Sequence, residues 1–76
     1  MQNLLEARVT VVGLGIEGID LVRFLTSEGA RVTVSDARPP EQLTDQLAAI
    51  EGTGARLSLG ANRLEDCTEA DAIYVS

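Results

Sequence analysis

Val9-Thr10-Val11-Val12-Gly13-Leu14-Gly15-Ile16-Glu17-Gly18 is the stretch that decides the fold of this chain. A mostly apolar run of strand type passes directly into three closely spaced glycines, and a helical pattern follows. In such a turn one glycine tolerates a positive φ, a second lets the backbone approach a ligand, and a third lets the helix pack against the strand. Free N–H groups at the start of the helix favour an anion. The stretch therefore predicts a site for a phosphorylated ligand.

An acidic residue ends the second predicted strand, residues 31–36. The Asp36 carboxylate stands where it can accept hydrogen bonds from ribose hydroxyls, and its charge disfavours a 2′-phosphate. Arg38 follows two residues later, and its guanidinium either lies over a base or pairs with Asp36. Glu17 competes with a phosphate for the helix amides if it points inward, and we expect it to turn outward to solvent.

Strand-like and helix-like segments alternate along the chain, which predicts a parallel sheet with helical connections. Right-handed crossovers then give the strand order 3-2-1-4. We expect an α/β protein with a Rossmann-like open parallel sheet of about four strands and flanking helices. The predicted strands are 8–13, 31–36, 55–59 and 72–75; the predicted helices are 16–28 and 40–51, with a loop or single helical turn at 62–67.

Apolar periodicity supports the two predicted helices. Gly29 ends the first as a left-handed cap, and the proline pair at 39–40 precedes the second. The first strand is nearly continuously apolar, as expected when both faces of a parallel sheet are covered. The positions expected to be buried in the helices are Ile19, Val22, Leu25, Leu43, Leu47 and Ile50.

The last predicted strand, residues 72–75, forms an uncovered edge of the sheet. A further strand normally protects such an edge. We therefore expect residues 1–76 to form a single, incomplete domain at the amino-terminal end of a longer protein. We also hypothesise self-association through this edge.

Composition excludes several classes of function. The formal charge of −6 argues against non-specific attraction to nucleic acid or anionic lipid. All six cationic residues are arginines, and without lysine or histidine neither a Walker-type phosphate loop nor a Ser-His-Asp relay can be assembled. The lone Cys67 rules out an intrachain disulfide and a multi-cysteine zinc site. The 12 carboxylates are interpreted as a solvated surface.

The apolar segments are short. None approaches the roughly 20 residues that a membrane-spanning helix requires. The first residues lack the basic and apolar regions of a secretory signal. We expect a cytoplasmic protein without membrane contact.

Three blocks of sequence give the chain a family resemblance. It resembles the amino-terminal domain of the Mur ligases, in the branch that adds D-glutamate to UDP-N-acetylmuramoyl-L-alanine. The first block is shared with dinucleotide-binding proteins in general, whereas the Asp-x-Arg run and the serine after strand four are more particular to these ligases. The blocks are Val11–Gly18, Val32–Pro40 and Ala70–Ser76.

The resemblance implies that the domain holds the UDP part of a sugar nucleotide, with the glycine turn near the phosphates and the other two blocks around uracil. Glu17 stands where the family often has a phosphate-binding hydroxyl, and Ala37 where a threonine commonly follows the aspartate. Each departure removes a hydroxyl contact. The residues that inherit substrate-binding roles are Gly13, Leu14, Gly15, Ile16, Glu17, Gly18, Asp36, Ala37, Arg38 and Ser76.

The family reaction uses ATP and magnesium to activate the substrate carboxylate, which the amine of D-glutamate then attacks. The resemblance assigns these steps to further ligase domains, so we expect no catalytic residue and no ligase activity in this chain. Two alternatives use the same fold. One is the front part of an NAD- or FAD-dependent oxidoreductase, and the other is a nucleotide-sensing regulatory module.

Overall fold

A four-stranded parallel sheet lies at the centre of the computed structural model, which describes residues 3–76. The strand order is β3-β2-β1-β4, so the predicted order is confirmed. Thr10 is the register partner of Thr33 on one side and of Ile73 on the other. The strands are β1 (Arg8–Val12), β2 (Arg31–Asp36), β3 (Arg56–Leu59) and β4 (Ala72–Val75).

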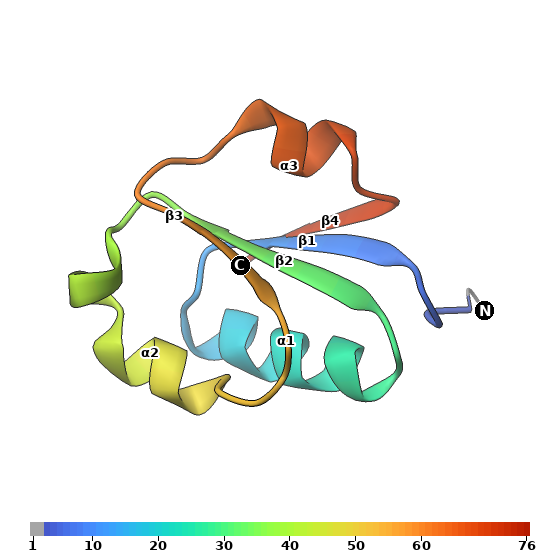
Figure 1. Cartoon of the computed structure of the whole chain (residues 1–76), viewed down its shortest axis with the longest axis horizontal. Coiled ribbons are helices and arrows are strands. Elements are labelled where there is room, and N and C mark those ends of the chain that lie inside the picture. The colour runs from blue at the N-terminus through green and yellow to red at the C-terminus, as the bar shows by residue number, and fades with distance from the viewer. Residues whose placement is uncertain (1–2) are drawn as a thin grey trace.

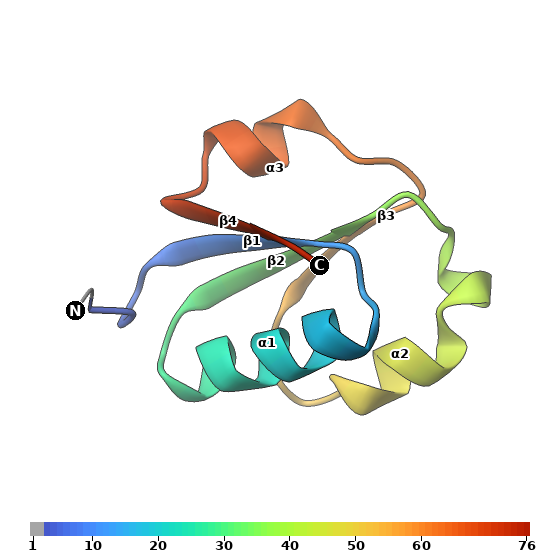
Figure 2. The ribbon, with the colours of Figure 1, turned by 180° about the vertical axis from the view of Figure 1, so that it is seen from behind.

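The helices cover the two faces of the sheet unequally (Figure 1). Helices α1 and α2 lie on one face, and the short α3 lies on the other. Seen from behind, the chain ends beside the loop that joins β1 to α1 (Figure 2). The helical elements are α1 (Ile16–Ser27), the 3₁₀ turn η1 (Pro40–Gln42), α2 (Thr44–Ala49) and α3 (Leu64–Thr68). None of the helices within residues 3–76 has the length and apolar character needed to cross a membrane.

The second predicted helix is shorter than expected. Residues 40–51 do not form one helix, because the backbone at Leu43 leaves helical geometry with φ −123° and ψ 21°. The Leu43 side chain is fully buried at this junction between η1 and α2. The other boundaries differ from the predicted ones by a residue or two, and Gly29 follows α1 with a φ of +87°, as predicted.

The hydrophobic core lies between the sheet and the helices α1 and α2. Side chains that alternate along β1 and β2 point to this face, where each buried aliphatic group contributes about 1.5–3 kcal/mol. Leu14 adds to it from the turn after β1. The buried members are Val9, Val11, Leu14, Val22, Leu25, Val32, Val34 and Ile50.

The opposite face of the sheet is also covered, but it is polar, which the nearly continuous apolar character of the first strand does not indicate. Thr10, Ser35 and Ser58 are buried there and are bonded to the α3 segment. The Thr10 hydroxyl donates to the Asp66 carbonyl, Ser35 Oγ donates to Asn62 at 2.8 Å, and Arg63 donates to Ser58 Oγ at 2.9 Å. Alternation in β1 and β2 therefore separates an apolar layer from a hydrogen-bonded one.

Candidate functional site

The glycine turn connects β1 to α1 and is hydrogen-bonded to the carboxyl end of β2. Gly13 has a φ of +95°, and its N–H donates to the Ser35 carbonyl at 2.8 Å. The next N–H, that of Leu14, donates to Asp36 Oδ2 at 2.9 Å, while the Leu14 side chain is fully buried. Two consecutive amides thus tie the turn to the end of β2. This edge of an open parallel sheet is the one that binds ligands in α/β proteins.

The three glycines of the turn serve different purposes. Gly13 has the left-handed backbone that glycine favours. A β-carbon on Gly18 would come closer to the Gly13 carbonyl oxygen than real β-carbons come to any atom, so α1 could not pack on the turn. Gly15 has an ordinary extended backbone, with φ −92° and ψ −166°, and a β-carbon there would meet nothing within 4 Å. Neither conformation nor internal packing requires a glycine at this position.

The first amides of α1 are free of internal partners. Gly15 is the N-cap and supplies no side-chain cap, and the first intrahelical bond runs from the Ile19 N–H to the Gly15 carbonyl at 2.9 Å. The N–H groups of Ile16, Glu17 and Gly18 have no acceptor within residues 3–76. With the positive end of the helix dipole behind them, these three groups can bind an anion.

Asp36 and Arg38 form an ion pair with several hydrogen bonds beside the turn. Arg38 donates to Asp36 Oδ1 from its backbone N–H at 2.9 Å and from Nε at 3.0 Å, and to Oδ2 from Nη2 at 2.8 Å. Asp36 is 5% exposed. The hydrogen bonds from Arg38 hold the pKa of the Asp36 carboxyl well below its usual range, and the same pair raises the pKa of Arg38. Of the two arrangements left open for Arg38, the structure shows the pairing.

The remaining predicted residues lie around the same edge. The Ser76 N–H donates to the Val12 carbonyl at 3.0 Å, and Ser76 Oγ donates to the Gly13 carbonyl at 2.6 Å. Ile16, Glu17 and Ala37 are exposed. Glu17 makes no ion pair within residues 3–76, so no salt bridge of this side chain blocks the free amides of α1.

Sequence reasoning missed one feature near the turn, an apolar groove between α1 and β4. The two aromatic residues of the chain are largely exposed there: Phe24 is 55% exposed and Tyr74 is 43% exposed. The groove has a volume of about 470 Å³. Its lining residues are Glu17, Asp20, Leu21, Phe24, Tyr74, Val75 and Ser76. Phe24 of α1 and Tyr74 of β4 come to line the same groove only in the folded chain. The sequence pattern of either element alone does not predict the groove.

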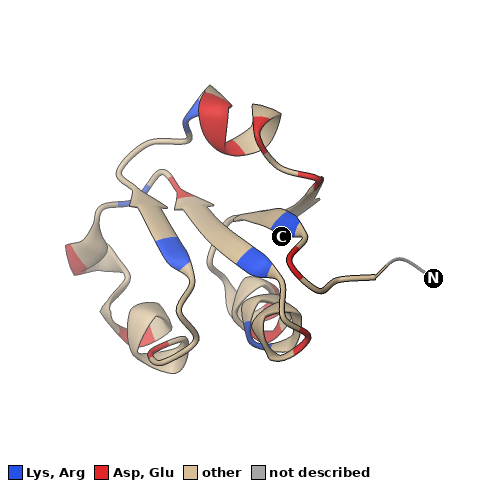
Figure 3. Ribbon diagram, turned by 45° about the vertical axis from the view of Figure 1, so that its right-hand side comes forward, with Lys and Arg blue, Asp and Glu red and all other residues tan. Residues whose placement is uncertain are grey.

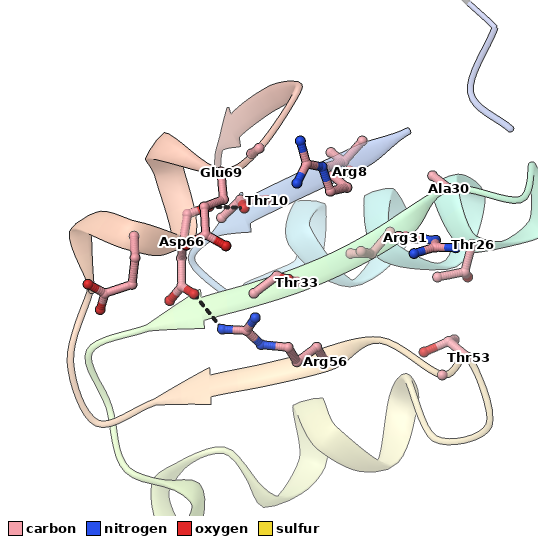
Figure 4. Close-up of a pocket in the computed structure, with 15 residues that line it drawn as sticks. Arg8, Thr10, Thr26, Ala30, Arg31, Thr33, Thr53, Arg56, Asp66 and Glu69 are labelled. Carbon is pink, nitrogen blue, oxygen red and sulfur yellow. Dashed lines mark hydrogen bonds and ion pairs between the residues drawn. The ribbon is translucent and has the colours of Figure 1, made fainter. Parts of the chain in front are cut away.

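A second hollow, of about 440 Å³, lies on the polar face of the sheet (Figure 4). The strands carry basic positions and α3 carries acidic ones (Figure 3). The arginines Arg8, Arg31 and Arg56 line it, and each has an acidic partner, at 3.9, 3.3 and 2.7 Å respectively. These arginines are at the amino ends of the strands, away from the edge where the glycine turn lies. Their charges are used within the chain, so we assign no ligand to this hollow.

The buried Asp66 corrects the interpretation of all carboxylates as a solvated surface. Its side chain is 1% exposed, and Oδ1 accepts a 2.7 Å hydrogen bond from Arg56 (Figure 4). Oδ2 is buried and has no hydrogen-bond partner among residues 3–76. Asp36 is the other buried carboxylate. Both are fixed by arginines, which composition alone does not show.

The parallel 3-2-1-4 sheet, the glycine turn at its carboxyl edge and the uncapped amides of α1 define a Rossmann-like α/β domain with an anion-binding turn. Residues 7–76 match the family described as Mur ligase MurD-like, N-terminal domain. Because this match covers nearly the whole chain, the chain belongs to that family, and the resemblance found in the sequence is confirmed.

Similar proteins carry the name UDP-N-acetylmuramoylalanine--D-glutamate ligase. The protein from Pelobacter propionicus is 44% identical over 74 residues, which are 97% of this chain and 17% of that protein. Those from Trichlorobacter lovleyi and Roseiflexus are 39% and 40% identical, over 97% and 93% of this chain and 17% and 16% of theirs. The chain thus spans about a sixth of the length of these relatives.

Among solved structures, a pyridine nucleotide-disulfide family oxidoreductase from Enterococcus faecalis matches with a TM-score of 0.57. The match covers 78% of this chain and 16% of the other, at 20% sequence identity. At that identity the likeness shows the fold alone. It does not favour the oxidoreductase alternative.

Proposed function

We propose that this chain is the UDP-binding amino-terminal domain of a ligase that adds D-glutamate to UDP-N-acetylmuramoyl-L-alanine. The names of its relatives support the choice of substrate, and the free amides at the turn support binding at that place. The observation that carries the proposal is the open space at Gly15. The fold gives no reason for a glycine there, whereas a diphosphate approaching the amides of Ile16, Glu17 and Gly18 needs that space.

The remaining contacts are proposed from the positions of the side chains around the turn. The uridine is expected to lie beside the end of β2, near the exposed Ala37 and the Arg38 side chain, which is 44% exposed, with Ser76 on the other side. Neither Glu17 nor Ala37 offers a hydroxyl. Phosphate binding in this chain therefore depends on backbone amides.

We assign the chemistry of the reaction to the parts of the ligase outside residues 1–76. ATP and Mg²⁺ are expected to bind there, because this chain has no lysine for a phosphate loop and residues 3–76 contain no group of three metal-ligating side chains. The chain alone is expected to have no ligase activity. We also propose that residues 1–76 form one domain, which contacts the remaining ligase domains. Self-association through β4 remains a hypothesis.

Titration of the chain with UDP tests the proposal. Amide chemical shifts of Gly15 and Gly18 should move on addition of UDP and respond little to NAD. Gly15→Ala and Gly15→Val should weaken UDP binding in that order, by roughly tenfold or more for valine, because each fills the space in front of the amides. An equal response to NAD, or undiminished UDP binding by Gly15→Val, would contradict the proposal.

A further inference from the structure

We propose that Asp36 is a positioning residue: its carboxylate clamps the glycine turn and the Arg38 guanidinium, and it does not contact the ligand itself. This inference deepens the proposed function, on which it rests, because the turn that Asp36 holds is the proposed diphosphate site. It reassigns a residue that sequence reasoning placed on the ribose. The clamp is defined by Leu14, Asp36 and Arg38.

The acceptor capacity of Asp36 is fully used within the chain. A carboxylate has about four lone-pair positions. Oδ1 accepts from the Arg38 backbone N–H and from Arg38 Nε, and Oδ2 accepts from the Leu14 N–H and from Arg38 Nη2, all at 2.8–3.0 Å. A ribose hydroxyl could bind Asp36 only by displacing one of these charge-assisted bonds.

The bond to Leu14 is the one that reaches the ligand site. Leu14 lies between Gly13, whose φ is +95°, and Gly15, the N-cap of α1. The amides of Gly13 and Leu14 are both held by the end of β2, at 2.8 and 2.9 Å. Fixing these two residues fixes where the next amides point, and those are the amides with no internal acceptor.

The ion pair also removes an electrostatic obstacle. A bare carboxylate beside the turn would repel a diphosphate. The Arg38 guanidinium pairs with it through two side-chain bonds, of 3.0 and 2.8 Å, so the clamp carries no net charge. Burial of Asp36 and the lowered pKa of its carboxyl keep this arrangement intact across neutral and mildly acidic pH.

The decisive experiment uses the double variant Asp36→Ala with Arg38→Gln, which removes the acceptor for the Leu14 N–H without changing net charge. Binding of inorganic pyrophosphate and of UDP is measured by calorimetry. If Asp36 positions the turn, pyrophosphate should lose affinity by about tenfold. UDP should lose at least as much, because the variant also removes Arg38, which the proposed function places beside the uridine. If Asp36 instead contacts ribose, UDP should weaken while pyrophosphate binds as before, and the inference would be overturned.

A matched control separates the clamp from a general loss of charged side chains. Asp45→Asn with Arg23→Gln also removes one acid and one base, at exposed positions on α2 and α1 that form no ion pair within residues 3–76. This control should bind both probes like the unmodified chain. A loss equal to that of the Asp36 and Arg38 variant would remove the support for a clamp.

A measurement without ligand distinguishes failure of the clamp from failure of the proposed function. Hydrogen exchange of the Leu14 amide should become about tenfold faster in the double variant, relative to Val11 in β1. Unchanged Leu14 exchange overturns the clamp, whatever the probes do. Faster exchange in a chain that binds neither probe supports the clamp and overturns the proposed function. If the double variant does not fold, Arg38→Gln alone should keep Leu14 protected, and faster exchange there would contradict the role of Asp36.

Discussion

Ser76 Oγ donates a hydrogen bond of 2.6 Å to the carbonyl oxygen of Gly13, 63 residues earlier in the chain. The same serine is the nearest neighbour of any β-carbon placed on Gly13, at 3.1 Å from its carbonyl oxygen and 3.2 Å from Oγ. The Ser76 N–H extends the β1–β4 pairing by one more bond, to Val12. Ser76, directly after β4, is thus hydrogen-bonded to one side of the glycine turn, and Asp36 to the other.

Ser76→Ala should lower the free energy of unfolding by about 0.5–1.5 kcal/mol, because it removes a long-range hydrogen bond. Ser27→Ala is a matched control, since Ser27 Oγ also donates at 2.6 Å, but to Phe24 within its own helix. Urea unfolding of both variants provides the comparison. A Ser76→Ala variant as stable as Ser27→Ala would show that the bond does not hold the turn.

Gly18→Ala and Gly15→Ala should differ sharply in stability. A β-carbon at Gly18 clashes with backbone, so we expect Gly18→Ala to lower the free energy of unfolding by about 1–3 kcal/mol. Gly15→Ala meets open space and should change it by less than about 1 kcal/mol. Thermal or urea unfolding measures both. Equal losses would mean that Gly15 too is a packing glycine, which would weaken its assignment to the ligand.

The fold could be predicted because its signals are periodic and local. A nearly continuous apolar run locates β1, and a strand-like segment that ends on an acid locates β2. Glycines and prolines mark the breaks, and the handedness rule converts element order into strand order. The interruption at Leu43 could not be predicted from the apolar spacing. That spacing is the same for an interrupted helical segment as for a continuous helix, and Leu43 is buried as either arrangement would require.

The position of the candidate site in the fold could be predicted from the sequence, but its pattern of hydrogen bonds could not. The motif places Gly13 to Gly18 and Asp36 at one edge of the sheet. Whether Asp36 points at a ligand or at its own chain depends on side-chain geometry, and the sequence offered both Arg38 arrangements as equals. The buried Asp66 is a similar case, because a lone acid on a short amphipathic segment looks like any surface acid until the sheet covers it.

Asp36 should contribute to the pH dependence of stability. Its folded-state pKa is lowered by Arg38 and the backbone amides, so the folded state binds the proton less readily than the unfolded state. The contribution is therefore complete above about pH 5, well clear of the unfolded pKa of about 3.9, and is lost as the pH falls toward the folded value. Asp36→Asn should flatten the decline of the unfolding free energy between about pH 5 and pH 2. An unchanged slope in urea unfolding at several pH values would refute the assignment.

The Arg56–Asp66 pair should stabilise α3 on the polar face of the sheet. Arg56→Ala leaves a carboxylate that is 1% exposed without its counter-charge. Because Arg56 itself is 65% exposed, we expect a loss of only about 1–2 kcal/mol, below the range for fully buried pairs. In an Asp66→Asn background the same change should cost less, since no buried charge is left unpaired.

Arg31→Ala serves as the control for this double-mutant cycle of Arg56 and Asp66, because the side chains of Arg31 and its partner Glu6 are both 68% exposed. Its loss should stay below about 0.5 kcal/mol. Urea unfolding of the two single variants, the double variant and the control gives the coupling energy. If Arg56→Ala costs the same in both backgrounds, the pair does not anchor α3. The hydrogen bonds that Thr10, Ser35 and Ser58 make with residues 62–66 would then hold this segment on the sheet.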